Sequence, residues 1–315
     1  MQIANRCVIC DSTEFNTLPA QLAPFISYRI FPWRPVYTIG DVFDLVAKKK
    51  VYRLFRPLLY LLGLGTKYFP LMIAAIHCRK CGFLFSDLRP DSAELARIYS
   101  DYRGPSYVRD RKRFEPGYAQ FNFKLGDAEE VALRVANLEE VLKKVKLPLD
   151  EIHVLLDYGG DEGQFIPDSM HGTRKIVYEV SDKPARAGVE KIAEIAKVPP
   201  IDFGMICHVL EHIPYPLDTL LELRSLIRPG GYVYIEVPLD VCAAIFGLTS
   251  IDGLERGDIG TGSVFFHEHI NFFSPRSVGR LLQRAGFEVV FNEIAVLELR
   301  GVPTKIISAI GKRIG

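Results

Sequence analysis

Four of the six cysteines occur in two pairs with the spacing of metal ligands. Each pair encloses two residues, as CVIC and as CRKC followed by glycine, which allows a tight turn that directs both thiolates at one ion. Four thiolates fill the tetrahedral positions of zinc, so such an ion would be structural rather than catalytic. The pairs lie farther apart than in a compact zinc ribbon, and two unrelated reduced pairs are the alternative. The predicted zinc ligands are Cys7, Cys10, Cys78 and Cys81.

A second group of reactive side chains is a His-Glu-His run at His267, Glu268 and His269. It directly precedes a helix start, with Ser274 as the N-cap and Pro275 in the first position. Two imidazoles around a carboxylate can supply a general base and a group that stabilises developing negative charge. Neighbouring side chains of an extended segment point to opposite sides, which suits a mononuclear metal site poorly. A polar loop between aromatic residues, without a catalytic role, is the alternative.

A third group follows a predicted strand in the second half of the chain. The run DYGGDEG places Asp157, Gly159, Gly160 and Gly163 in a turn from strand to helix, where the backbone can approach a ligand and the helix offers free amides. Glu179 ends the next strand, where a carboxylate can accept hydrogen bonds from ribose hydroxyls. A glycine turn alone is a weak signal, but here CHVLEHI and IRPGG follow in order at later strands. Together these marks predict a cofactor that contains a nucleoside.

These groups need elements that position them. From residue 153 onward, short β-rich runs alternate with helix-length segments; the runs are HVLLDY, KIVYEV, IDFGMIC, YVYIEVP and FEVVF. This alternation predicts βαβ units, and therefore an α/β fold with a doubly wound, mostly parallel sheet that has helices on both faces. Residues 127–146 have the periodicity of a helix. We expect a zinc-binding module with an apolar insertion at 1–105, a helical linker at 106–148 and the α/β domain at 149–315.

Composition and charge narrow the classes of protein. The chain has 48% hydrophobic and 24% charged residues, as in ordinary globular proteins. Its 39 basic and 38 acidic residues nearly balance, which tells against a dedicated nucleic-acid binder. The N-terminal residues lack the pattern of a signal peptide, so we expect a cytoplasmic protein. The apolar stretch at 58–76 is interrupted by glycine, lysine and proline, and we expect no transmembrane segment.

The ordered set LLDYGGDEG, VYEV, ICHVLEHIPYP and LIRPGGYVYIEVP resembles the class I S-adenosylmethionine-dependent methyltransferases over about residues 149–291. The resemblance implies a seven-stranded, Rossmann-like fold and S-adenosylmethionine as cofactor. It implies that the glycine turn holds the methionine part, that Glu179 holds the ribose, and that Cys207 and His208 lie beside the adenine or the methionine. Asp161 stands where the family has its middle glycine. A nicotinamide enzyme is the alternative, but its third glycine spacing is absent.

The paired cysteines together with HEHINFFS resemble the zinc-containing sugar C-methyltransferases, which methylate nucleotide-linked keto-deoxysugars. This resemblance implies that the His-Glu-His run and His212 surround the sugar. It also implies a tyrosine after the second cysteine pair, for which Tyr102 is the match and Tyr107 the alternative. In such a reaction a base, for which histidine is suited, removes a proton beside a ketone, and the enolate attacks the sulfonium methyl. A sugar hydroxyl would need the same base without an enolate, so O-methylation of a glycan precursor stays open.

Two other functions stay open. An RNA methyltransferase would bind phosphates through the zinc module and a basic run, although such a run is more often a solvated helix face. A non-catalytic interaction module would keep only the fold. We expect a sugar or nucleotide-sugar as the small-molecule partner, with a homodimer as an option. The apolar insertion at 51–76 and the C-terminal TKIISAIGKRIG would contact a membrane surface or a second copy, or pack against the protein's own core. The basic run comprises Arg109, Arg111, Lys112 and Arg113.

Overall fold

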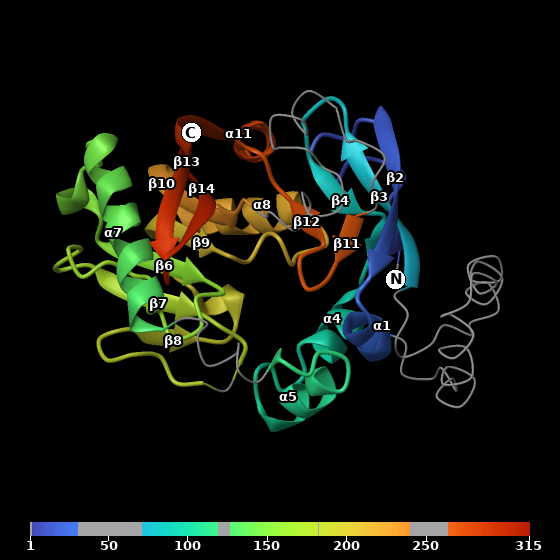
Figure 1. Cartoon of the computed structure of the whole chain (residues 1–315). Helices are drawn as coiled ribbons and strands as arrows, with labels where there is room; N and C mark the ends of the chain where they lie inside the picture. Colours follow the sequence, from blue (N-terminus) through green and yellow to red (C-terminus); the bar gives the residue numbers. More distant parts are fainter. Residues whose placement is uncertain (1, 31–70, 119–126, 182, 240–263) are drawn as a thin grey trace, which may run out of the picture.

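The computed structural model describes residues 2–30, 71–118, 127–181, 183–239 and 264–315 (Figure 1). Most of the apolar insertion, as well as Cys242, lies outside the described residues. Two sheets of five or more strands organise the described residues. The larger sheet contains β6 (Val154–Tyr158), β7 (Arg174–Tyr178), β8 (Glu190–Ile192), β9 (Ile201–Cys207), β10 (Ile227–Pro238), β13 (Phe287–Leu299) and β14 (Val302–Arg313).

The seven strands of this sheet have the order β13-β14-β10-β9-β6-β7-β8. The five strands from β10 to β8 pair in parallel, and only β14 runs antiparallel to both of its neighbours. The parallel strands are short apolar runs such as IDFGMIC in β9, because a parallel strand is covered on both faces. The mostly parallel, Rossmann-like sheet predicted from the sequence is therefore confirmed.

Helices cover both faces of this sheet. On one face α7 (Ala128–Lys144) packs its buried side chains, among them Leu138 and Val141, against residues of β6, β9 and β10. On the other face lie α8 (Pro216–Leu226) and α11 (Pro275–Arg284), which contact each other. Ser274 caps α11 by accepting a hydrogen bond from the amide of Ser277, as its sequence predicts. No helix in the described ranges is long and apolar enough to cross a lipid bilayer.

The connections after β6 and after β8 differ from the predicted alternation of strands and helices. Residues 159–173 form turns and contain no helix, and the segment from β8 to β9 contains only the 3₁₀ turn η2 (Ile195–Lys197). The expected helix with free amides behind the glycine turn is therefore wrong. Gly160, Gly163 and Pro167 explain this, because glycine and proline are the two poorest helix formers.

The C-terminal TKIISAIGKRIG forms most of β14, which lies between β10 and β13. The side chains of Ile306 to Ile310 are all buried. Of the alternatives given for this segment, the structure shows packing against the protein's own core for these residues. A strand that is buried on both faces forms an apolar run without alternation. Basic residues on both sides of this run, Lys305 and Lys312, make the same sequence resemble an amphipathic tail.

The second sheet combines three N-terminal strands with two strands from residues 264–272. Its order is β11-β2-β3-β4-β12, in which β11 pairs in parallel with β2 and β12 pairs antiparallel with β4. The His-Glu-His run connects β11 to β12, so strands on its two sides complete opposite edges of the N-terminal sheet. The domain boundaries given above stay a prediction. The strands are β2 (Phe15–Leu22), β3 (Leu71–Cys78), β4 (Leu84–Ser86), β11 (Val264–Phe266) and β12 (Asn271–Phe272).

Three helices lie at one end of the second sheet (Figure 1). They are α1 (Pro24–Ile30), α4 (Ser92–Ile98) and α5 (Pro105–Lys112). The basic run named above therefore begins inside α5 and ends at its C-cap residue, Arg113. Smaller elements are the ladder of β1 (Gln2–Ile3) with β5 (Leu88–Arg89), and the 3₁₀ turn η1 (Leu149–Glu151).

Candidate functional site

The four paired cysteines meet at one point at the base of the N-terminal sheet. The Sγ atoms of Cys7 and Cys81 lie 3.6 Å apart, and those of Cys10 and Cys78 lie 3.5 Å apart. All four sulfurs lie within 4.8 Å of one another and all four side chains are buried. A tetrahedral zinc–thiolate centre with bonds of about 2.3 Å has sulfurs about 3.8 Å apart. Gly82 follows the second pair with φ of 73°, the left-handed conformation that closes a tight turn. The cluster has the dimensions and donors of a zinc site.

The glycine turn packs closely around a buried carboxyl group. Asp157 is fully buried, and within the described part of the chain neither of its carboxyl oxygens has a hydrogen-bond partner. Burial raises its pKa to about 7. A Cβ atom at Gly160 would lie 2.1 Å from Oδ2 of Asp157, so glycine is required there. Asp161, in the place of the family's middle glycine, has φ of 54°, which aspartate tolerates better than most residues.

The structure brings Glu179 against this turn. Its carboxylate accepts hydrogen bonds from the amide of Asp161 at 3.3 Å and from the amide of Ser181 at 2.8 Å. At the end of β9, Cys207 is buried and His208 adopts φ of 54°. The Nε2 atom of His208 lies 3.4 Å from a carboxylate oxygen of Glu236. The residues assigned to the cofactor thus lie at the carboxyl ends of β6, β7 and β9, where ligands of α/β sheets bind.

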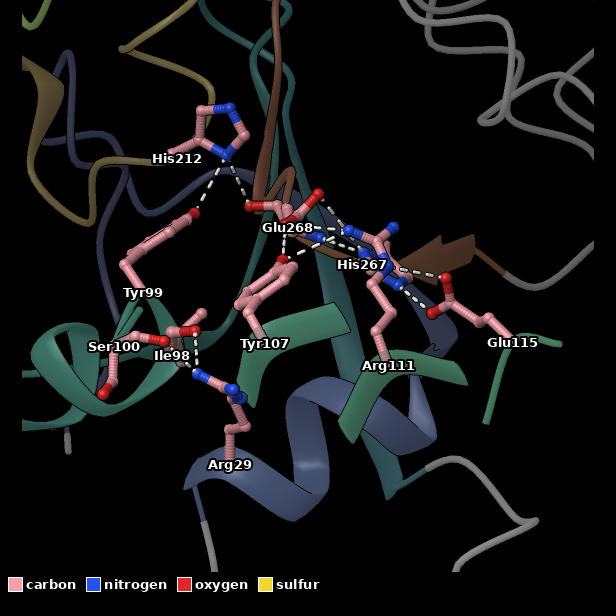
Figure 2. A network of polar contacts seen from close by, with 10 residues as sticks. All are labelled: Arg29, Ile98, Tyr99, Ser100, Tyr107, Arg111, Glu115, His212, His267 and Glu268. Carbon is pink, nitrogen blue, oxygen red and sulfur yellow. Dashed lines mark hydrogen bonds and ion pairs between the residues drawn. The ribbon is translucent and has the colours of Figure 1, made fainter. Parts of the chain in front are cut away.

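His267 is held by both of its ring nitrogens (Figure 2). Nδ1 accepts a hydrogen bond from the amide of Glu268 at 2.8 Å, so this nitrogen carries no proton. Nε2 donates to the carboxylate of Glu115. The ring also stacks on Phe25, with 6.1 Å between the centroids. His267 therefore has no lone pair left for a substrate proton.

Glu268 is the anion at the centre of the same network. It accepts a hydrogen bond from the hydroxyl of Tyr107 and forms an ion pair of 3.0 Å with Arg111. Burial alone would raise the pKa of this carboxyl group, but the positive charge of Arg111 outweighs it and holds the pKa at about 2. The side chain of Glu268 is therefore ionised near neutral pH and fixed toward the N-terminal helices.

His212 lies where the third-strand motif meets this loop. Its Nδ1 atom is 3.0 Å from the backbone oxygen of Glu268 and 3.0 Å from the hydroxyl of Tyr99. Because a carbonyl oxygen can only accept, Nδ1 carries the proton and Nε2 keeps its lone pair. Burial and then the neighbouring His269 lower the pKa of His212. The rings of His212 and His269 meet edge to face, 4.7 Å apart, and Nε2 lies 3.9 Å from the carboxylate of Glu211.

The three tyrosines near the loop take different positions. Tyr107, the alternative named from the sequence, is the one that binds Glu268, and it is fully buried. Tyr102 is 37% exposed and touches the rings of Tyr99 and Tyr107 edge-on. Tyr99, the C-cap residue of α4, binds His212 and is not predicted at the site, because its spacing from Leu95 indicates only the apolar face of a helix. Arg111 was expected at most as a phosphate ligand of an RNA-binding surface.

Arg29 fastens the helices that carry these tyrosines. Its guanidinium donates to the backbone oxygens of Ile98 and Ser100 at the end of α4, at 3.2 and 2.7 Å. It also forms an ion pair of 3.1 Å with Asp110 of α5. Tyr99 and Tyr107 are thereby held on the same side of the histidine cluster.

Asn271 joins the His-Glu-His loop to the turn that carries His212. Its side-chain nitrogen donates to the backbone oxygens of Leu210 and Ile213, each at 2.7 Å. Its side-chain oxygen accepts from Nη1 of Arg89 at 2.8 Å, and its own amide donates to the oxygen of Glu211. Sequence reasoning missed this residue, since an asparagine after HEHI gives no signal of such contacts.

Comparisons with known proteins agree with this arrangement. A family model for the methyltransferase domain matches residues 128–291, just over half of the chain. A ubiquinone biosynthesis O-methyltransferase from Nitrosospira multiformis is 29% identical over 86 residues, which are 26% of this chain and 33% of that protein. The chain thus matches about a third of the length of this curated relative.

Two similar solved structures belong to methyltransferases as well. One is the 1,6-didemethyltoxoflavin-N1-methyltransferase of Burkholderia thailandensis, with 15% identity, coverage of 74% of this chain and 96% of that chain, and a TM-score of 0.43. The other is an S-adenosylmethionine-dependent methyltransferase of Mesorhizobium loti, with 14% identity, coverage of 55% and 96%, and a TM-score of 0.37.

Proposed function

Because the chain belongs to the methyltransferase-domain family, we propose that this S-adenosylmethionine-dependent methyltransferase methylates a carbon beside the ketone of a nucleotide-linked sugar. The observation that carries the proposal is the contact between the His-Glu-His loop and His212. It brings two imidazoles together at the carboxyl end of β9. That edge also carries the glycine turn, whose Gly159 packs on Val209 in the turn before His212.

The cofactor is assigned to the edge formed by β6, β7 and β9. When bound, S-adenosylmethionine supplies a methyl group on a positively charged sulfur. Glu179 would accept hydrogen bonds from the ribose hydroxyls, and its two contacts with backbone amides hold it toward the turn. The turn of Asp157, Gly159, Gly160 and Gly163 would face the methionine part, with Cys207 and His208 beside it. Two observations support the fit of this turn to the cofactor. Asp157 is a buried carboxyl group without a hydrogen-bond partner among the described residues, and the close packing at Gly160 leaves no room for a side chain.

The base is assigned to the pair His212 and His269 rather than to His267. A general base needs a lone pair that faces its proton. His267 uses both nitrogens, whereas Nε2 of His212 keeps its lone pair and faces Glu211 and His269. One imidazole of the pair would take the proton from the carbon beside the ketone. The enolate carbon would then take the methyl group as its bond to the sulfur of S-adenosylmethionine breaks, which leaves neutral S-adenosylhomocysteine. Glu268 and His267 act as positioning residues in this account.

The four-cysteine cluster is assigned to one structural zinc ion. Its sulfur spacing, burial and turn geometry support this. The ion would fasten the N-terminal end of β2 to the turn after β3. Because all four donors are thiolates, the site leaves no position open for a substrate.

The choice of a sugar rests on the resemblance of HEHINFFS and of the paired cysteines to the sugar C-methyltransferases. The RNA alternative loses support, because Arg111, the least exposed residue of the basic run, is ion-paired with Glu115 and Glu268. O-methylation of a glycan precursor would use the same base, and it is separated by the product alone.

The experiment is a binding assay on the purified full chain. Nucleotide-linked keto-sugars are titrated into the protein saturated with S-adenosylhomocysteine, and heat is recorded by calorimetry. We expect a nucleotide-linked keto-sugar to bind, and an unrelated RNA hairpin not to bind. Binding of the RNA hairpin together with no binding of any sugar nucleotide would refute the proposal.

A further inference from the structure

A second cluster of metal-ligating side chains lies apart from the cysteines. Glu211, His212 and His269 each offer one ligand atom, and these three atoms all lie within 4.8 Å of one another. Glu211 and His212 come from the turn after β9, and His269 comes from the loop between β11 and β12. Asn271 and Arg89 hold these two segments together through buried hydrogen bonds.

Glu211 is the group that most needs a cation. It is 1% exposed, and within the described residues neither of its carboxylate oxygens has a hydrogen-bond partner. Its nearest basic atoms are Nδ1 of His208 at 3.5 Å and Nε2 of His212 at 3.9 Å. A buried carboxylate without hydrogen bonds is strongly destabilised unless a positive charge lies beside it. A metal ion between the carboxylate and the imidazoles would supply that charge.

His212 has the orientation of a metal ligand. Its Nδ1 hydrogen is donated to the backbone oxygen of Glu268, which places the lone pair of Nε2 toward Glu211. Metal-bound histidines usually donate their other ring nitrogen to a carbonyl or carboxylate oxygen, which fixes the ring and its tautomer. The supporting contact of a metal ligand is therefore already present.

We propose that Glu211, His212 and His269 form a binding site for one divalent transition-metal ion, separate from the four-cysteine cluster. Two imidazoles and one carboxylate suit ions such as Zn²⁺, Co²⁺, Ni²⁺ or Fe²⁺, and they leave coordination positions open. The consequence for activity rests on the proposed function. An ion on Nε2 of His212 and on His269 occupies the lone pairs that the base would use, so it inhibits methyl transfer.

The test is a titration of the zinc-loaded full chain with Co²⁺, followed by calorimetry and visible absorption. A cobalt–thiolate centre absorbs strongly in the near ultraviolet, whereas nitrogen and oxygen ligands give only weak visible bands, so the two sites are distinguished. We expect one further Co²⁺ per chain without a thiolate band. Glu211→Gln and His269→Gln should each weaken this binding at least about tenfold. His171→Ala, at an exposed histidine elsewhere, should leave it unchanged.

Failure of the zinc-loaded chain to bind any Co²⁺, or equally tight binding by both variants when circular dichroism shows them folded, would overturn the site. Methyl transfer measured at the same Co²⁺ concentrations separates the site from the reaction. Inhibition that persists unchanged in Glu211→Gln, which keeps both histidines, would count against the site. Activation by Co²⁺ that depends on Glu211 would support the site and overturn the assignment of the histidine pair as base.

Discussion

The Nδ1 atom of His212 lies 3.0 Å from the backbone oxygen of Glu268, and this contact decides which nitrogen of His212 is available to a substrate. The two residues come from segments 56 positions apart in the sequence. Since the carbonyl oxygen must accept, Nε2 holds the lone pair. The same contact places His269, the next residue of the loop, edge to face with the ring of His212.

Removal of either member of the histidine pair should abolish most of the activity. We expect His212→Ala and His269→Ala to lower the single-turnover rate of methyl transfer by roughly 10²- to 10⁴-fold, the usual contribution of a general base. His267→Gln should lower it less, because His267 acts only through Glu115 and Glu268. The affinity for S-adenosylhomocysteine is measured alongside as a control and should not change. An equal loss of rate in all three variants would contradict the assignment.

Glu179→Ala should weaken cofactor binding by about 1.5–3 kcal/mol, the range for hydrogen bonds to a charged group. The loss has two sources, since the carboxylate would bind ribose and also accepts from the amides of Asp161 and Ser181. Calorimetry with S-adenosylhomocysteine measures it. Glu190→Ala is the control, because Glu190 lies exposed on the edge strand β8 and forms an ion pair with Arg174 of the neighbouring strand β7. The same affinity for wild type and Glu179→Ala would reject the role of this carboxylate.

Asn271→Leu should destabilise the fold by about 2–4 kcal/mol, because it leaves several buried polar groups unpaired at once. These are the backbone oxygens of Leu210 and Ile213 and the guanidinium of Arg89. Asn292→Leu removes a single bond to the oxygen of Pro275 and should cost less. Urea unfolding of the two variants gives the comparison. If Asn292→Leu were the more destabilised variant, the bridging role of Asn271 would be wrong.

The four-cysteine cluster predicts one zinc ion per chain, held by thiolates. Cys78→Ser should lower the zinc content measured by elemental analysis. Hydrogen exchange should then show the larger loss of protection in the N-terminal sheet, since the cluster joins the loop before β2 to the end of β3. Carefully purified wild-type protein without zinc would refute this assignment. Loss of protection centred on β6 would contradict the claim that the ion stabilises the N-terminal sheet.

Acid should weaken the contact between α7 and the sheet. Burial alone would raise the pKa of Glu236, but Arg134, at 2.6 Å, outweighs it and holds the pKa at about 2, below its ordinary value of 4.5. The stability that this pair contributes is therefore present above pH 4.5 and is lost as the pH falls from 4.5 toward 2. Urea midpoints over this range should fall more steeply in the wild type than in Glu236→Gln. Parallel slopes would contradict the ion pair.

Five strands of the larger sheet and the position of the glycine turn could be predicted, because strands buried on both faces leave apolar runs that end in short motifs. Residues 159–173 show the limit. Their length suggests a helix, but glycines and a proline replace it with turns, and only the three-dimensional path reveals that. The strand β14 was hidden for another reason, since its apolar residues fit equally a buried strand and an amphipathic tail.

At the histidine site, the sequence identified the reactive side chains but not their roles. His267 and His269 are equivalent in the HEH motif, and only the contacts with Glu115 and His212 distinguish them. Tyr99 and Asn271 act through hydrogen bonds to residues more than 50 positions away. Such contacts depend on how the two sheets meet, which no local pattern encodes.

The central claim is that one of the two paired histidines removes a proton from carbon before the methyl group is transferred. The most direct test incubates the enzyme with a nucleotide-linked keto-sugar and S-adenosylhomocysteine in deuterated water, and follows the sugar by proton NMR. The account predicts that the hydrogen beside the ketone exchanges for deuterium although no methyl donor is present, and that His212→Ala and His269→Ala slow this exchange. A keto-sugar that is methylated with S-adenosylmethionine but never exchanges this hydrogen, or a product with the methyl group on oxygen, would contradict it.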